Sequence, residues 1–417
     1  MKNKAKIIRL LYIAAIIVLF LFTERTIRGN FLFSCTYRMQ TISTYLPIIC
    51  SWIIFAAFIV FAIRKKLRFS FGVLIPYCII YLGYLAATLI NHASMVRWTD
   101  AFVYSLPPFM LAIMAFSCTE TAKIYIKSAT WIFVFLAAMN LLFDVFPQMW
   151  GLISEWREEY FLGYHTLVSW PLTTGLMFAF LDREYNGRNW LLIIYLILFF
   201  ANMAVVRAGG ALVGAFIVAL WLLLPFVRKA FKKWNMLVFI AIVVALFAVL
   251  MWGFQPFVNF PPVKAFIENV LHKDITLSGR LYVWSGVLER VYASPFIGYG
   301  FGDSTQIFFE PSKWNNTMVH AHNLFLQCWY EGGIITLLLG LGMLVFAAFK
   351  MEKCRNLREN CNESLCGVFK LLIFAALIML QSDQDVYYNW YIPAFFCHLA
   401  IVSMESSNGE TIKPQTD

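Results

Sequence analysis

Long runs of apolar residues recur along this 417-residue chain, and they restrict its fold more than any other feature. About 20 apolar residues in a helix cross the hydrocarbon core of a membrane, where a helix satisfies its own backbone hydrogen bonds. The composition agrees, because 61% of the residues are hydrophobic and 13% are charged. A soluble domain carries about 25% charged residues. The sequence therefore predicts an all-α polytopic membrane protein.

The apolar runs predict about 12 transmembrane helices. They cover residues 7–23, 43–63, 69–90, 101–117, 128–146, 161–181, 190–206, 209–227, 236–254, 332–349, 367–381 and 386–404. No polar segment is long enough to form a core of its own. We therefore expect residues 1–405 to form a single integral membrane domain, followed by a disordered cytoplasmic tail at 406–417.

The distribution of charge predicts the orientation. With the N-terminus in the cytoplasm, the cytoplasmic segments hold 22 of the 33 Lys and Arg residues but 9 of the 23 Asp and Glu residues. Positive charge is normally retained on the cytoplasmic side. This asymmetry predicts that both termini are cytoplasmic. It also explains the basic balance of the chain without a nucleic-acid partner.

In this orientation, one long loop, at about 255–331, lies outside the cytoplasm. Loops of this length are uncommon unless they have a function. The stretch "RLYVWSGVLERVYA" within it has apolar residues at helical spacing, which predicts a short amphipathic helix with Ser278 as its N-cap. Arg280 would then lie in the first turn, where the helix dipole disfavours a cation unless an anion is bound. A helix N-terminus with a guanidinium can bind phosphate; the alternative is a solvated loop arginine.

Other polar residues are predicted at the outer ends of spans: Arg207, His320, His322 and Asp383. Arg207 has apolar runs on both sides, so its partner is either distant in sequence or a ligand; an arginine at a helix end also reaches the interface without any further role. The His-x-His pair would place both rings on one side of an extended segment, which is compatible with a metal site, but no third ligand is near in sequence. His322 could instead be a general base, since an imidazole pKa of about 6.5 suits proton removal near neutral pH.

Taken in order, these motifs resemble the O-antigen ligase and polysaccharide polymerase family. The matching features are "SGRLYVW" with Gly279 and Arg280, the Pro-x-x-Gly-x-Gly turn of "SPFIGYGFG", and "HAHN" before a helix. "VVRAGG" resembles the arginine element of the family at Arg207, and "QSDQD" resembles its Ser-Asp element. The resemblance extends over roughly residues 190–400.

The resemblance implies a metal-independent, inverting glycosyltransferase without a cofactor, on the extracytoplasmic face of the bacterial cytoplasmic membrane. Its donor would be a glycan on undecaprenyl diphosphate, its acceptor a sugar hydroxyl of a glycan or lipid-linked glycan, and its surroundings membrane lipid. Arg207 and Arg280 would bind the diphosphate and His322 would act on the acceptor hydroxyl. The supporting, substrate-binding residues would be Gly279, His320, Asn323 and Asp383.

The sequence leaves the acceptor open. An O-antigen ligase would transfer the whole glycan, whereas a surface or capsular polysaccharide polymerase would extend a lipid-linked chain by the same chemistry. A transporter of lipid-linked glycans is an alternative from another class, although transporters tend to place polar groups at mid-membrane.

Overall fold

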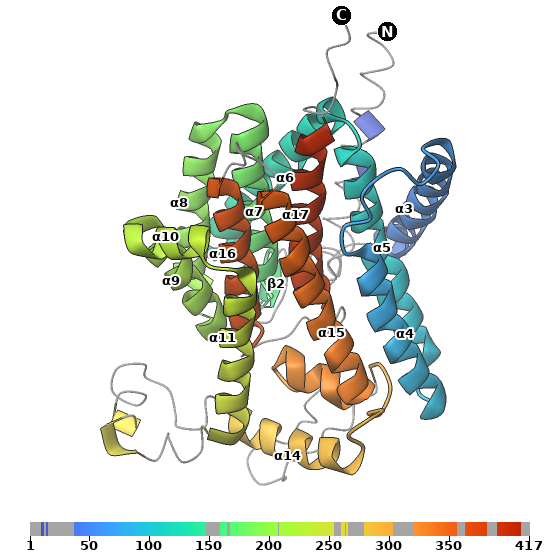
Figure 1. Cartoon of the computed structure of the whole chain (residues 1–417), viewed down its shortest axis with the longest axis vertical. Coiled ribbons are helices and arrows are strands. Elements are labelled where there is room, and N and C mark those ends of the chain that lie inside the picture. Colours follow the sequence, from blue (N-terminus) through green and yellow to red (C-terminus); the bar gives the residue numbers. More distant parts are fainter. Residues whose placement is uncertain are drawn as a thin grey trace, which may run out of the picture.

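The computed structural model is a bundle of helices (Figure 1). It describes residues 10–11, 14–15, 37–146, 159–164, 167–206, 208–253, 260–262, 264–265, 279–302, 320–356, 363–381 and 390–409.

Helices make up almost all of the described part of the chain. They are α3 (Tyr37–Arg64), α4 (Leu74–Ile90), α5 (Met95–Phe116), α6 (Thr119–Val145), α7 (Ser169–Asn186), α8 (Asn189–Val206), α9 (Gly209–Leu223), α10 (Pro225–Lys233), α11 (Met236–Ala248) with its π-helical extension η2 (Val249–Gly253), α14 (Arg280–Ala293), α15 (Leu324–Asn356), α16 (Glu363–Met379) and α17 (Tyr391–Gly409). A small antiparallel hairpin joins β1 (Glu159–Tyr160) to β2 (Gly163–Tyr164) before α7.

The helical fold class is confirmed, and a helix overlaps each predicted span from 43–63 onward. By length and apolarity, five described helices can cross a membrane, or six if α9 and α10 form one broken span. Four shorter apolar helices occupy further predicted spans. The first predicted span, 7–23, lies largely outside the described residues, so the total of twelve stays a prediction.

Two predicted boundaries are wrong. The first residues of the predicted span 161–181 belong to the hairpin, and α7 begins only at Ser169. Span 209–227 stops at Leu223, because the chain bends by 100° between α9 and α10, where Pro225 cannot continue a helix. The break in α15 at Gly333 falls beside the predicted boundary between the long loop and span 332–349.

Helices α15, α16 and α17 form the centre of the bundle (Figure 1). Helix α17 contacts α5, α7, α15 and α16, and nearly all of its side chains are buried. Gly340 allows α15 to approach the residue before α17, since a Cβ there would lie 2.3 Å from the indole of Trp390. The Trp390 indole N–H also donates to Cys328 Sγ at 3.1 Å, which fixes the first part of α15 in the core.

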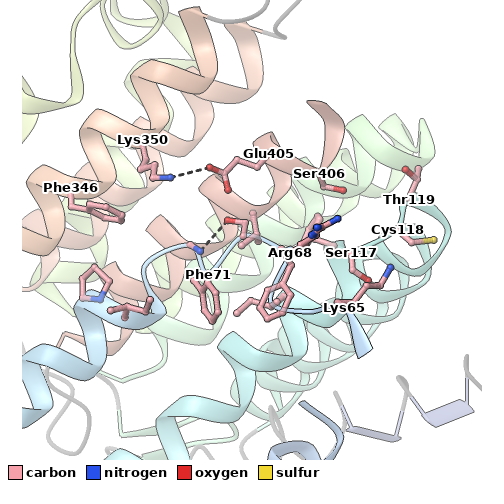
Figure 2. A pocket seen from close by; sticks show the side chains of 18 residues that line it. Lys65, Arg68, Phe71, Ser117, Cys118, Thr119, Phe346, Lys350, Glu405 and Ser406 are labelled. Atoms are coloured by element: carbon pink, nitrogen blue, oxygen red, sulfur yellow. Dashed lines mark hydrogen bonds and ion pairs between the residues drawn. The ribbon is translucent and has the colours of Figure 1, made fainter. Parts of the chain in front are cut away.

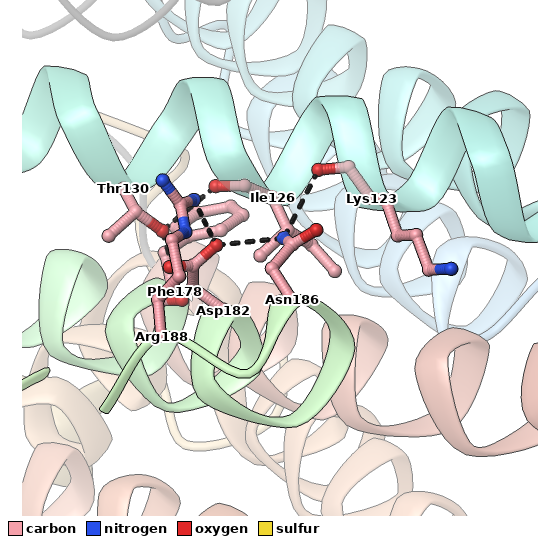
Figure 3. Close-up of polar contacts among 7 residues, drawn as sticks. All are labelled: Lys123, Ile126, Thr130, Phe178, Asp182, Asn186 and Arg188. Atoms are coloured by element: carbon pink, nitrogen blue, oxygen red, sulfur yellow. Dashed lines mark hydrogen bonds and ion pairs between the residues drawn. The ribbon is translucent and has the colours of Figure 1, made fainter. Parts of the chain in front are cut away.

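Two buried carboxylates, Asp182 and Glu352, are paired within the protein. Asp182, fully buried, forms an ion pair with Arg188 and accepts a hydrogen bond from Asn186 at 2.8 Å (Figure 3). On α15, Glu352 accepts from Lys370 of α16 at 2.6 Å. These pairs join neighbouring helices, so the charges have a structural explanation.

Candidate active site

Arg280 is the first residue of α14, as the sequence predicts, but the residue that caps the helix is Gly279 and not Ser278. Gly279 has φ of 83°, a left-handed conformation that glycine adopts without steric cost. It makes no side-chain cap, and its carbonyl accepts from Tyr282 N at 3.1 Å. A glycine here therefore sets the start of the helix and places the guanidinium at its N-terminus.

Helix α14 is held against the peptide between the two histidines. The buried indole N–H of Trp284 donates to the Ala321 carbonyl at 3.0 Å. The Ala321 N–H in turn donates to Gln327 Oε1, in the second turn of α15, at 2.7 Å. Ala321 has no solvent exposure. Helices α14 and α15 thus fix the His-x-His segment from two sides.

Asn323 caps α15. Its side-chain oxygen accepts from the N–H groups of Phe325 and Leu326, both at 3.0 Å. Its side-chain nitrogen donates to the carbonyl and side-chain oxygens of Gln381 at 3.0 and 3.2 Å. Asn323 is fully buried. Its amide groups are engaged within the protein, which is typical of a residue that positions its neighbours.

The two imidazole rings lie side by side. Their centroids are 3.9 Å apart, with the ring planes inclined by 58°. The backbone N–H of His322 donates to His320 Nδ1 at 3.3 Å, so this nitrogen acts as an acceptor and carries no proton. His322 has φ of 48°, in the left-handed region where a non-glycine residue costs about 1–3 kcal/mol. Strain of this kind persists where surrounding contacts impose it, and here the contacts of Ala321 and Asn323 do so.

Electrostatics keep His320 neutral. Burial, together with the cationic charge of Arg280, lowers the pKa of His320 to about 4. Arg280 is therefore close enough to act on this ring, although 39 residues separate the two in sequence. The structure brings together Gly279, Arg280, His320, His322 and Asn323. Arg207 and Asp383 lie outside the described residues; Asp383 follows Gln381, the partner of Asn323, by two positions.

The glycine turn between α14 and the histidines supports a break in α15. Gly333 has φ of 69° and ψ of 179°, which interrupts the helix. Tyr299 N and Gly300 N donate to the carbonyls of Tyr330 and Glu331, both at 2.9 Å. The turn packs against the break and satisfies the carbonyl groups that the break leaves.

Two residues of the first part of α15 were not predicted to contribute. Glu331, 3% exposed, accepts from Gln327 Nε2 at 2.8 Å and from Gly302 N at 3.1 Å. Gln327 thereby connects Glu331 to Ala321. The spacing of four residues between Gln327 and Glu331 was the available signal, because side chains four apart share a helix face.

A cavity of about 320 Å³, lined mostly by apolar side chains but also by Ser285 and Glu289, lies beside α14, between this helix and the extension of α11. Leu250 and Met251 line one side, and Leu281, Trp284 and Leu288 line the other. Leu281 directly follows Arg280, so the cavity begins at the residue next to the guanidinium. Trp284 itself is 2% exposed and packs inside.

Metal-ligating residues are sparse in this region. Within the ranges that the structure describes, no group of three or more His, Cys, Asp or Glu side chains is arranged to hold a metal ion.

Comparison with known proteins connects this geometry to a family. Residues 191–341 match the sequence model of the O-antigen ligase family. This interval contains Arg207, Gly279, Arg280, His320 and His322, and ends after the break at Gly333.

The relatives point the same way. A Rickettsia conorii protein named as a polysaccharide ligase is 28% identical over 149 residues, which cover 33% of this chain and 34% of that protein. The exopolysaccharide production protein ExoQ of Rhizobium meliloti is 28% identical over 143 residues, 32% of each chain. The ComP-specific O-oligosaccharyltransferase of Acinetobacter baylyi is 25% identical over 236 residues, 53% of this chain and 42% of the other. The chain thus spans about a third of the length of the first two relatives. The resemblance that the motifs indicate is confirmed: the segment carrying the arginine helix and the two histidines matches the O-antigen ligase family.

Proposed function

We propose that this protein transfers a glycan from an undecaprenyl-diphosphate carrier to a sugar hydroxyl, on the extracytoplasmic side of the bacterial cytoplasmic membrane. The observation that carries the proposal is the position of Arg280. It begins a helix whose Trp284 holds the peptide between His320 and His322, within the segment that matches the O-antigen ligase family. A cation for the donor phosphate and imidazoles for the acceptor hydroxyl are thereby adjacent.

In the proposed reaction, His322 accepts a proton, and the negative charge develops on the diphosphate of the carrier. The acceptor oxygen forms a bond to the anomeric carbon while its proton passes to His322. The bond from that carbon to the diphosphate oxygen breaks, and the electron pair leaves with undecaprenyl diphosphate. Attack opposite to the leaving group inverts the anomeric configuration. Arg280, with Arg207, stabilises the charge that develops on the diphosphate.

The surroundings of the two histidines support this division of roles. Burial and the charge of Arg280 keep His320 neutral. His320 therefore adds no positive charge to that of Arg280, and its imidazole can hydrogen-bond to a hydroxyl. Asn323 and Gly279 position the histidine and arginine elements through the backbone. We assign Asp383 to the same face, as a residue that contacts the sugar or orients His322. The mostly apolar cavity beside Leu281 suits the first isoprene units of the carrier.

The proposal has two forms, which differ in the acceptor molecule. A ligase transfers the glycan to lipid A core, and two relatives named as a polysaccharide ligase and an O-oligosaccharyltransferase favour transfer to a different molecule. The exopolysaccharide production protein favours a polymerase that extends a lipid-linked chain. Both forms use the same residues at Arg280 and His322.

The test is a transfer assay with purified protein in nanodiscs. The donor is a synthetic undecaprenyl-diphosphate glycan, and the acceptors are lipopolysaccharide with a bare core, a second molecule of lipid-linked repeat, and a glycan-free control. We expect a new glycosidic bond of inverted configuration with one acceptor, unaffected by EDTA. Loss of transfer on chelation with rescue by zinc would contradict metal independence. Movement of labelled donor across vesicles without any new bond would replace the proposal with transport.

A further inference from the structure

A second cavity, of about 910 Å³, lies where α3, α5, α15 and α17 end (Figure 2). It is bounded by the α3–α4 connection, the α5–α6 connection, and the last turns of α15 and α17. Lys350, in its wall, lies about 25 Å along α15 from the break at Gly333. None of its lining residues belongs to the candidate active site, and its volume is typical of a site for a small molecule.

The charge of this cavity is positive. Three cationic side chains line it, Lys65, Arg68 and Lys350. Among the lining residues Glu405 is the one carboxylate, and it lies 3.5 Å from Lys350 Nζ, so these two charges offset each other. Lys65 and Arg68 remain as an excess of positive charge. Figure 2 shows both side chains ending on the side of the cavity that Ser117 lines.

The backbone turn after α3 directs these two cations. Lys66 and Leu67 have φ of 49° and 55°, two successive non-glycine residues in the left-handed region. Arg68 N donates to the Lys65 carbonyl at 3.0 Å, which closes the turn. As a result Lys65 and Arg68 both line the cavity, whereas Lys66 between them does not. This turn is present although each left-handed non-glycine residue in it costs about 1–3 kcal/mol of stability.

Two helix N-termini add to the positive potential. Cys118 and Thr119 begin α6, and Gly72 and Ile75 belong to the start of α4; all four line the cavity. The N-terminus of a helix favours negative charge. The thiol of Cys118 reports this effect, because its pKa is lowered, chiefly by the backbone N–H of Thr121.

The remaining walls are apolar and lead to a lipid-facing surface. Phe71, Phe116 and Phe346 line the cavity. On α15, Phe346 is 37% exposed, and Phe349, three residues further along, is 60% exposed. Such surfaces of a membrane protein face lipid. A ligand with a charged head and an apolar tail would satisfy both parts of the wall, whereas a free anion would leave the aromatic part unused.

We propose that this cavity binds the headgroup of an anionic phospholipid from the cytoplasmic leaflet, with Arg68 and Lys65 contacting the phosphate and the acyl chains leaving past Phe346. The site is independent of the glycan transfer proposed above, and its residues take no part in that reaction. The shared chemistry is that of a phosphate ester, so a soluble phosphate compound is the competing ligand.

The experiment measures lipid retention by native mass spectrometry of the purified full-length chain in detergent. The probes are phosphatidylglycerol and phosphatidylcholine of identical acyl chains. We compare the wild type with the double variant Lys65→Gln/Arg68→Gln, with Arg68→Glu, and with Lys66→Gln as a matched control. All three lysine or arginine positions are exposed, so the variants should fold, and thermal unfolding checks this.

We expect the wild type and Lys66→Gln to retain phosphatidylglycerol over phosphatidylcholine. The double variant should bind phosphatidylglycerol on the order of tenfold more weakly, and Arg68→Glu should also lose the preference. Equal retention of the two lipids, or an equal loss in Lys66→Gln, would overturn the site. Displacement of phosphatidylglycerol by millimolar inorganic phosphate or ATP, with the same dependence on Arg68, would overturn the assignment to lipid.

Discussion

The indole N–H of Trp284 lies 3.0 Å from the carbonyl of Ala321, and this contact joins two motifs that are far apart in the chain. Trp284 is four residues after Arg280, on the same face of α14, and Ala321 separates His320 from His322. This buried hydrogen bond is thus one of the contacts that set the distance between the arginine and the imidazoles.

The first prediction concerns this bond. Trp284→Phe keeps an aromatic ring but leaves the buried Ala321 carbonyl without its donor, which costs about 1–3 kcal/mol. We expect slower transfer with donor binding largely retained, because α14 shifts relative to the histidines. Turnover and thermal unfolding of the purified variant test this.

Trp329→Phe is the matched control. Trp329 donates an equivalent indole hydrogen bond to Pro295 at 2.9 Å, at the glycine turn and not at the histidines. It should lose comparable stability and less turnover. Equal losses of turnover in both variants would contradict a specific role for the Trp284 contact.

The second prediction separates the arginine from the histidine. Arg280→Lys keeps the charge but loses the planar guanidinium that binds phosphate oxygens in pairs, so donor binding should weaken. His322→Asn should leave donor binding intact and slow transfer by roughly 10²–10⁴-fold if His322 is the general base. Asparagine is chosen because it tolerates the left-handed φ of 48° at this position.

Donor binding and single-turnover transfer in nanodiscs measure the two effects separately. The proposed site is wrong if His322→Asn transfers at the wild-type rate and Arg280→Lys binds donor normally.

The third prediction concerns pH. The pKa of His320 is lowered to about 4 by burial and by Arg280, against 6.5 for the exposed group. Between these values the unfolded chain binds a proton that the folded protein excludes, so stability is fully present above pH 6.5 and decreases as the pH falls toward 4. His320→Gln cannot titrate and should show a shallower decrease. Thermal unfolding across this range measures the difference, and identical slopes would contradict the assignment.

The sequence could predict the helices because lipid requires each spanning segment to satisfy its own backbone, which leaves a strong apolar pattern. It also predicted α14, whose bounds match the stretch "RLYVWSGVLERVYA". The motif "HAHN" was expected before a helix, and α15 begins directly after it at Leu324. The contributions of Gln327 and Glu331 could not be predicted in the same way. Their hydrogen bonds to Ala321 and Gly302 are tertiary contacts that no local pattern contains.

The candidate site was predictable as a set of residues but not as an arrangement. The motifs named Arg280, His320 and His322, yet only the fold reveals that Arg280 lies close enough to lower the pKa of His320. The roles of Asn323 and Gly279 could not be assigned without the structure, because a sequence motif does not distinguish a residue that caps a helix from one that binds substrate.

The fourth prediction tests the orientation of the bundle. In a Cys118→Ser background, which removes an exposed thiol, a cysteine at Tyr282 should react with an impermeant reagent added to intact cells. Tyr282 is 56% exposed on α14. A cysteine at Lys229, exposed on α10, should react only after permeabilisation. The opposite pattern would reverse the topology and place the arginine and histidines in the cytoplasm.

The fifth prediction tests the break in α15. A Cβ at Gly333 would lie 2.0 Å from the Phe296 carbonyl oxygen, and the residue has φ of 69°, so Gly333→Ala introduces both a clash with backbone and a strained conformation. Backbone cannot move aside as a flexible side chain can, because the glycine turn is tied to the break through Tyr299 and Gly300. We expect a loss of several kcal/mol in unfolding free energy, or failure to fold. Gly342→Ala, on the same helix with nothing within 4 Å of its added Cβ, should be neutral or stabilising by about 0.5–1 kcal/mol. Thermal unfolding of the two variants in detergent measures the contrast. If both alanines lowered the unfolding temperature equally, the close approach at Gly333 would not be what maintains the break.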